Sequence, residues 1–140
     1  MDLAPALSFA RTQPHGVLAT ARANGRPQLS NVGYAVGDDG AVRISITVDR
    51  AKYRNLRREP LASLHVTTPD FRAYVVIEAA AELSAPAAAP RDATVDALVE
   101  FYRGLVGEHP DWDEYRAAMV GDRRVLVTLR PQRAYGMPDD

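Results

Sequence analysis

The chain has 140 residues, enough to bury a core without metal or disulfide support, so we expect residues 1–140 to form a single domain. It contains no cysteine, which excludes disulfides and thiolate chemistry, and its formal net charge of −1 argues against a general nucleic-acid binder. No secretory signal and no run of about 20 apolar residues is evident, so we expect a soluble protein of the cytoplasm without a membrane segment.

The first third of the chain predicts one helix followed by an antiparallel meander. The expected elements are a helix over residues 3–12 and strands over residues 16–22, 27–36 and 43–48. Asp2 is a favourable cap for the helix, and Pro14 ends it. Asn24-Gly25 is a strong hairpin signal between the first two strands, and a turn over residues 37–40 precedes the third. We therefore expect these three strands to pair in chain order.

The rest of the chain predicts three more strands and three helices. The expected strands cover residues 61–68, 72–83 and 123–130, and the helices lie within 50–58, 92–106 and 111–120. Apolar residues in the second helix recur at i, i+3, i+4 and i+7, and Asp111 with Glu114 has the form of a capping box for the third. Six strands, mostly linked by hairpins, predict a mainly β (α+β) fold, a closed or split antiparallel barrel with peripheral helices. Side chains fill a barrel of this size, so a ligand as large as a cofactor must bind in an outer groove or between subunits.

Positive charge is densest between the third and fourth expected strands. Lys52 is the only lysine among 17 Lys and Arg residues, and it lies in the basic stretch 50–58. A strand that runs into a basic helix directs unpaired backbone N–H groups, the positive end of the helix dipole and cationic side chains at one point. This arrangement favours a phosphate or carboxylate, and a compact ammonium can contact one phosphate oxygen as a point charge. The alternative interpretation is a solvated helix face.

The usual catalytic motifs are absent from the sequence. It has no glycine-rich dinucleotide loop, no Walker loop, no paired-histidine zinc motif and no serine-hydrolase elbow. The three histidines, His15, His65 and His109, are too scattered to indicate a metal site, and we expect none. We identify no catalytic residue; if the protein is an enzyme, a bound cofactor is expected to supply its chemistry.

Several short segments, taken together in order and spacing, resemble one protein family over nearly the whole chain. They are Gly16-Val-Leu-Ala-Thr, Gly25-Arg-Pro-Gln-Leu-Ser-Asn-Val, Arg50-Ala-Lys-Tyr-Arg-Asn-Leu, Glu108-His-Pro-Asp-Trp-Asp and Asp122-Arg-Arg-Val-Leu with the later Tyr135-Gly136. The chain resembles the pyridoxamine 5′-phosphate oxidase-like superfamily of flavin- and deazaflavin-binding split β-barrels. Within it, the chain is similar to the small actinobacterial oxidoreductases that use coenzyme F420. The resemblance implies a six-stranded split barrel that forms a homodimer with two cofactor grooves at the subunit interface.

The resemblance also implies which residues hold the phosphate of the cofactor. By this likeness Arg50, Ala51 and Lys52 contact the phosphate, and Asn55 lies nearby. Arg54, Arg57 and Arg58 could bind the polyanionic tail of F420, which needs more cationic surface than the single phosphate of FMN does.

Five further residues are implied to lie beside the ring of the cofactor. Pro27, Gln28 and Ser45 would line the groove, and Phe71 and Tyr74 correspond to positions at which a partner subunit covers the cofactor. The alternative for Gln28 and Ser45 is an outward polar position on a strand, and for Tyr74 it is a core or interface position.

The function implied by the resemblance is hydride transfer between F420 and a small conjugated or unsaturated substrate. The protein would supply orientation, phosphate binding and water exclusion. Three alternatives remain: an FMN-dependent oxidoreductase or oxidase of the same fold, a protein that binds or stores F420 without turnover, and a nucleic-acid binder that uses residues 50–58. The substrate and the proton donor are not identified, although Tyr74 is a candidate for the donor.

Overall fold

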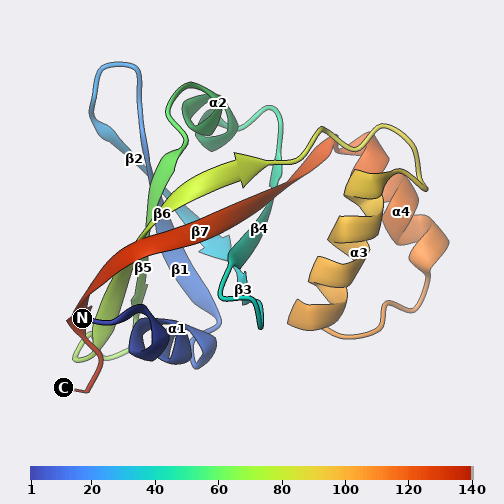
Figure 1. Ribbon diagram of the computed structural model, residues 1–140. Coiled ribbons are helices and arrows are strands. Elements are labelled where there is room, and N and C mark those ends of the chain that lie inside the picture. The colour runs from blue at the N-terminus through green and yellow to red at the C-terminus, as the bar shows by residue number, and fades with distance from the viewer. Residues whose placement is uncertain (140) are drawn as a thin grey trace.

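The computed structural model describes residues 1–139 and consists mainly of β-structure. In chain order the elements are α1 (Leu3–Arg11), β1 (His15–Ala21), β2 (Pro27–Gly33), β3 (Ala35–Val36), β4 (Val42–Thr47), α2 (Ala51–Arg58), β5 (Leu61–Thr67), β6 (Tyr74–Leu83), α3 (Ala93–Leu105), α4 (Trp112–Gly121) and β7 (Arg124–Met137). The strands form one antiparallel sheet in the order β2-β1-β5-β6-β7-β4-β3, which curls into a half-barrel (Figure 1). The half-barrel and its peripheral helices confirm the predicted class of fold.

The predicted three-stranded meander is confirmed in part: residues 27–36 form two strands instead of one, and only the second of these, β3, pairs with β4. The predicted total of six strands is wrong. β1 and β2 form the expected hairpin, with Gly25 at a φ of +85° in the turn. Residues 27–36 make two strands because the chain breaks at Tyr34, which turns its ring into the core and donates from its hydroxyl to the carbonyls of Ala10 (2.7 Å) and Gln13 (2.9 Å). β4 then pairs with β3 and β7 instead of β2, so the sheet has seven strands.

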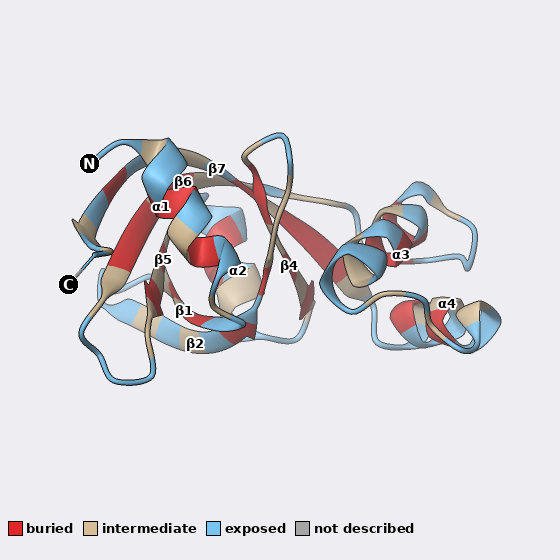
Figure 2. Cartoon of the chain, turned by 90° about the horizontal axis from the view of Figure 1, so that it is seen from below, coloured by how far each residue is buried: buried red, intermediate tan, exposed pale blue. Residues whose placement is uncertain are grey.

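Aliphatic side chains fill the interior of the half-barrel. Alternate residues of its strands point inward, and Leu18, Ile44 and Leu64 are among those that are fully buried. α1 covers one open end of the half-barrel and α2 the other, each with its buried face toward the sheet (Figures 1 and 2). Because a filled interior has no room for a cofactor, a ligand of that size must bind at the outside of the sheet.

β6 and β7 are the longest strands and carry the chain from the half-barrel to the helices (Figure 1). Their pairing runs from Tyr74 opposite Met137 to Leu83 opposite Val127, with an irregularity between Glu78 and Ala79. The last strand therefore extends well beyond the predicted residues 123–130.

α3 and α4 form a helical hairpin at one end of the sheet with a small core of its own (Figure 1). Asp111 caps α4 as expected from the sequence and accepts from the backbone N–H of Glu114 (3.1 Å). Asp92, which was not predicted as a cap, accepts from the backbone N–H of Val95 (2.8 Å) and caps α3. Asp2 occupies the same position before α1 but makes no capping hydrogen bond from its side chain, so that prediction is wrong.

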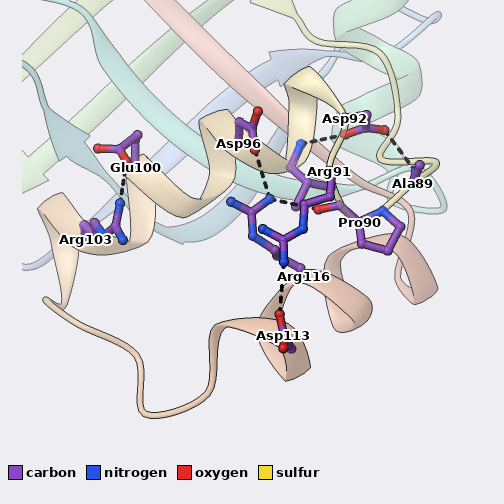
Figure 3. A network of polar contacts seen from close by, with 10 residues as sticks. Ala89, Pro90, Arg91, Asp92, Asp96, Glu100, Arg103, Asp113 and Arg116 are labelled. Carbon is purple, nitrogen blue, oxygen red and sulfur yellow. Dashed lines mark hydrogen bonds and ion pairs between the residues drawn. The ribbon is translucent and has the colours of Figure 1, made fainter.

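The surface of this hairpin carries a network of ion pairs (Figure 3). Arg116 of α4 donates from Nη1 to the carboxylate of Asp96 (2.9 Å) and to the carbonyl of Pro90 (2.8 Å), and Arg91 approaches Asp113 (3.3 Å). These contacts tie α4 to α3 and to the segment before it. None of the helices within residues 1–139 has the length and apolar character needed to cross a bilayer.

Candidate functional site

A polar cavity of about 370 Å³ lies at the corner where β4 leads into α2. Its lining residues are Ser30, Asn31, Ser45, Ile46, Thr47, Arg50, Lys52 and Arg124. The first two belong to β2, and the next three belong to β4. These two strands do not pair with each other, and we call the gap between them the split of the half-barrel. The cavity lies in this split. The structure thus brings together three of the residues predicted from the sequence, Ser45, Arg50 and Lys52.

The local backbone directs the start of α2 toward this cavity. Arg50 has an extended conformation (φ −82°, ψ 148°) at the N-cap position, and α2 begins with Ala51. Arg50 makes no capping hydrogen bond from its side chain, so its guanidinium is not engaged with the first turn of α2. The positive end of the helix dipole and two cationic side chains, those of Arg50 and Lys52, therefore face the same space.

The cavity is strongly electropositive. The pKa of Lys52 is lowered from its usual value, first by partial burial and then by the positive charges of Arg50 and Arg124. No carboxylate is among the lining residues of the cavity. Asp49 accepts a hydrogen bond from the Thr47 hydroxyl, which lowers the pKa of that carboxyl. Three cations around a cavity without an acidic lining residue make a site for an anion.

Arg124 is the component of the site that sequence analysis missed. It begins β7 and pairs with Thr47 across the β4–β7 ladder, so both side chains lie on one face of the sheet. Its Nε is buried and, among residues 1–139, is the one buried side-chain nitrogen or oxygen of a non-exposed residue without a hydrogen-bond partner. The nearest acidic atom recorded for it is Oδ2 of Asp122 at 3.7 Å, beyond hydrogen-bonding distance.

Ser30, Asn31 and Thr47 were also missed. Thr47 could have been found, because it lies two residues from Ser45 and therefore on the same face of β4. Ser30 and Asn31 depend on how β2 approaches β4 across the split, and Arg124 depends on the pairing of β4 with β7. No local pattern in the sequence specifies either arrangement.

Asn55, predicted to lie near the phosphate, does not line the cavity. It is 6% exposed and donates from Nδ2 to Oγ1 of Thr20 (3.1 Å), while its Oδ1 accepts from Arg58 (3.1 Å). The structure therefore gives Asn55 a role in joining α2 to β1. Ala51 is half-buried in the first turn of α2, between two lining residues.

The residues predicted to lie beside the ring are spread along the neighbouring surface. Gln28 is half-buried on β2, two residues from Ser30 and on the same face. Pro27 lines a different cavity, of about 380 Å³, beside Glu78 and Arg133 on the outer face of the sheet. Neither Gln28 nor Pro27 lines the cation-rich cavity.

Phe71 and Tyr74 lie around a third, more apolar part of the surface. Phe71 is 78% exposed, has a φ of +62° and lines a cavity of about 590 Å³ together with His15 and His65. Asn31 lines both this apolar cavity and the polar one, so the two adjoin. The ring centre of Tyr74 lies 5.8 Å from that of His65. Within one chain, Phe71 and Tyr74 do not line the cation-rich cavity.

The remaining arginines of α2 lie outside the cavity. Arg54 donates to the carbonyl of Asp49 (3.1 Å), and Arg58 donates to the carbonyl of Ala21 (2.6 Å). The guanidinium of Arg57 lies 5.6 Å from the centre of the Tyr53 ring. Two of the three therefore stabilise the ends of α2 and β1, and all three remain on the exposed side of the helix.

An antiparallel half-barrel with a cavity lined by cationic side chains in its split is the class of protein that fold and site define. Residues 5–137 match the pyridoxamine 5′-phosphate oxidase family, and the chain belongs to this family.

Three solved structures illustrate the similarity. The conserved hypothetical protein Rv2991 from Mycobacterium tuberculosis is 25% identical with a TM-score of 0.74, and the match covers 99% of this chain and 85% of that one. An F420 reductase is 26% identical with a TM-score of 0.67, covering 91% and 94% of the two chains. A heme binding protein from Mycobacterium smegmatis is 22% identical with a TM-score of 0.70, covering 98% of this chain and 54% of that one, and it shows similarity of fold alone.

Proposed function

We propose that this protein is an oxidoreductase that binds coenzyme F420 and transfers hydride between it and a small conjugated or unsaturated substrate. The observation that carries the proposal is the cation-lined cavity in the split, with Arg50, Lys52 and Arg124 around one space. Membership in the pyridoxamine 5′-phosphate oxidase family and 26% identity to an F420 reductase over 91% of the chain support it.

The residues present fit the phosphate of such a cofactor. Arg124 has a buried Nε without a partner, and Lys52 loses part of its hydration and gains repulsion from two arginines. A phosphate in the cavity would supply the negative charge that compensates these cations. The hydroxyl group of Ser45 lines the same cavity and offers a further donor, whereas the hydroxyl of Thr47 already donates to Asp49. A cavity of about 370 Å³ suits the phosphate end, and the adjoining apolar cavity of about 590 Å³ suits a ring.

When bound, the deazaflavin supplies the hydride chemistry, and the protein's own residues bind and orient it. Arg50 and Lys52 would fix one end of the cofactor, and Ser45 and Asn31 would contact it between that end and the apolar cavity. Gln28 and Pro27 precede Ser30 on β2, on the side away from the apolar cavity, so they would contact the cofactor only at its phosphate end. Holding the two reactants in one geometry converts a bimolecular encounter into an effectively unimolecular step, and a covered groove excludes water.

We also propose that the protein is a homodimer in which Phe71 and Tyr74 cover the cofactor of the partner. Large apolar side chains gather on the outer face of the sheet. Cross-strand register places Leu29 and Tyr135 on this face together with Leu61 and Met137, and all four are exposed. An apolar face of this kind is typical of a protein–protein contact.

Spectral titration of the purified protein with F420 and with FMN tests the proposal. We expect F420 to bind more tightly, and we expect the protein loaded with reduced F420 to be oxidised by at least one member of a panel of enones, quinones and tetrapyrroles. Tighter binding of FMN would make the protein an FMN-dependent oxidoreductase of the same fold. Tight binding of F420 without oxidation by any member of the panel would make it a protein that carries or stores the cofactor.

A further inference from the structure

The junction between α4 and β7 reaches the anion site although it lies far from α2 in the sequence. α4 ends at Gly121, Asp122 is its C-cap, and Arg124 begins β7 and lines the cavity. Arg123, between them, has a φ of +51°, a left-handed conformation that is uncommon for a residue other than glycine. Strained residues of this kind persist where the surrounding structure holds them, and they cluster at binding sites.

Arg124 lines the cavity, and its buried Nε makes no hydrogen bond. Ladder pairing with Thr47 fixes its position beside β4. The carboxylate of Asp122 lies 3.7 Å from Nε, close enough for attraction between the charges but too far for a hydrogen bond. The buried Nε has no acceptor, so the charge of Arg124 is incompletely compensated, and a ligand that places negative charge in the cavity is favoured.

We propose that Arg124 is a third ligand of the anionic group that Arg50 and Lys52 bind, and that Asp122 positions it. This inference rests on the proposed function of the site and adds the α4–β7 junction to it. The planar guanidinium presents parallel N–H groups that match two oxygens of a phosphate, whereas Lys52 offers a single point charge. Residues from two distant segments of the chain, the β4–α2 corner and the start of β7, then contact the phosphate.

The electrostatics of the site agree with this role. Arg124 contributes to the lowering of the Lys52 pKa, so the two cations repel each other across the cavity. An anion between them would turn this repulsion into attraction from both sides. The carboxylates of Asp122 and Asp49 act on Arg124 from beside the cavity, and neither is among its lining residues.

The experiment compares ligands that do and do not carry the phosphate. Fluorescence measures the binding of two ligand pairs. The first pair is FMN and riboflavin, and the second is F420 and the deazaflavin that lacks its phosphate-linked tail. The proteins compared are the wild type, Arg124→Ala, Arg124→Lys, Asp122→Asn and Arg130→Ala. Arg130 is the matched control, since it is an arginine of the same strand that pairs with Glu82 (3.3 Å) and Asp39 (3.6 Å) away from the cavity.

We expect Arg124→Ala to weaken binding of the phosphate-bearing ligand by at least about tenfold and to leave the ligand without phosphate unchanged. Arg124→Lys should retain only part of the affinity, because it keeps the positive charge and loses the parallel N–H donors of the guanidinium. Asp122→Asn should give a smaller loss, and Arg130→Ala should give none. If Arg124→Ala does not fold, as judged by circular dichroism, the same ligand pairs are compared in Arg124→Lys and Asp122→Asn.

Inorganic phosphate and pyrophosphate serve as probes that do not depend on the cofactor. We expect both to raise the Tm of the wild type and of Arg130→Ala, and to raise that of Arg124→Ala less. Equal affinities of wild type and Arg124→Ala for FMN and F420 would overturn the inference and leave the proposed function intact. The protein could bind neither cofactor and still show an increase in Tm with phosphate that is smaller in Arg124→Ala. That result would support the inference and overturn the proposed function. A wild type that responds to neither cofactor nor phosphate would overturn both.

Discussion

Lys52 combines partial burial with two cationic neighbours, and that combination makes its charge more costly than that of an exposed lysine. Its pKa is lowered by desolvation and by Arg50 and Arg124. An anion in the cavity would offset both effects, so we expect Lys52→Ala to weaken F420 binding by at least about tenfold, roughly 1.4 kcal/mol. Spectral titration measures the loss, and thermal unfolding should show that the domain remains folded.

Two variants separate the charge of Lys52 from its aliphatic stem. Lys52→Met keeps most of the stem and removes the charge, so it should lose as much affinity as Lys52→Ala does. Arg91→Ala removes an exposed cation that pairs with Asp113 on the helical hairpin and should bind like the wild type. Unchanged binding by Lys52→Met would mean that the phosphate lies elsewhere.

For single residues, the sequence predicts those members of the site that lie close together in the chain. Arg50 and Lys52 could be grouped because a strand followed directly by a basic helix places them at one corner, and Ser45 was added through the family resemblance. Arg124 could not be added, because an arginine at the start of a strand has no local mark that distinguishes it from the other arginines. Asn55 was also placed near the phosphate by the resemblance, and its amide donates to Thr20 in β1.

Among the elements, α3 depends on the cap that Asp92 provides. Its carboxylate accepts hydrogen bonds from the backbone N–H groups of Val95 and Ala88, and these lower its pKa. It also accepts from the backbone N–H of Ala89 (Figure 3). We expect Asp92→Ala to lower the free energy of unfolding by about 0.5–2 kcal/mol at neutral pH, measured by urea denaturation. Asp2→Ala is the matched control and should change stability by a few tenths at most, since Asp2 makes no capping bond from its side chain.

The effect of Asp92 should depend on pH in a direction that its pKa fixes. The folded-state pKa lies below the usual value of 3.8, so the carboxylate stabilises the fold above about pH 3.8. This contribution is lost as the pH falls through the folded-state pKa and Asp92 becomes protonated. The difference in stability between wild type and Asp92→Ala should therefore shrink on acidification; a difference that grew toward low pH would contradict the assignment.

Gly136 fixes the close approach of β7 to β6. Its φ is +144°, and a Cβ at this position would lie 2.4 Å from the carbonyl oxygen of Tyr74 and 2.7 Å from Cα of Val75. Because both neighbours are backbone atoms in a paired strand, they cannot move without breaking the ladder. We expect Gly136→Ala to destabilise the protein by at least about 2 kcal/mol in denaturant unfolding.

Gly33 provides the comparison for Gly136. It also lies in a strand, but a Cβ there meets nothing within 4 Å, so Gly33→Ala should change stability by about 0.5 kcal/mol or less. Equal unfolding midpoints for the two variants would show that β6 and β7 can separate near their ends at little cost.

The sequence predicts most elements because their signals are local: the Asn24-Gly25 turn, the acidic cap of α4, and the helical spacing of apolar residues. It fails where a distant contact decides the local structure. Tyr34 continues the alternation of residues 27–36, but its hydroxyl donates to carbonyls at the end of α1, and the strand breaks there. Only the last part of this segment, β3, therefore pairs with β4, and the other neighbour of β4 is β7.

For the whole molecule, that break in pairing creates the site. If β2 and β4 were paired as neighbours, their polar residues would be ordinary surface positions of a continuous sheet. The sheet instead places β2 at one edge and β4 beside the other, and the residues facing the split form the cavity with the start of α2. The feature that the sequence could not supply, the order of strands, is thus the one that assembles the anion site.

The same outer face that carries the apolar residues should hold two copies of the chain together. Leu29 is 62% exposed and Tyr135 is 51% exposed, and both lie on the face formed by β2, β1, β5, β6 and β7. We expect the wild type to have twice the mass of one chain in size-exclusion chromatography with light scattering, and Tyr135→Glu to shift it toward a single chain, because a charge in an apolar contact must lose its hydration.

Leu105→Glu is the control for this prediction, since Leu105 is an exposed leucine on α3, outside that face, and its replacement should leave the mass unchanged. If each groove is completed by the partner, Tyr135→Glu should also weaken F420 binding, although Tyr135 lines none of the three cavities described above. A wild type that remains a single chain at high concentration with F420 present would contradict the dimer. A single chain of Tyr135→Glu with full affinity would show instead that one chain suffices for the cofactor, and that Phe71 and Tyr74 take no part in covering it.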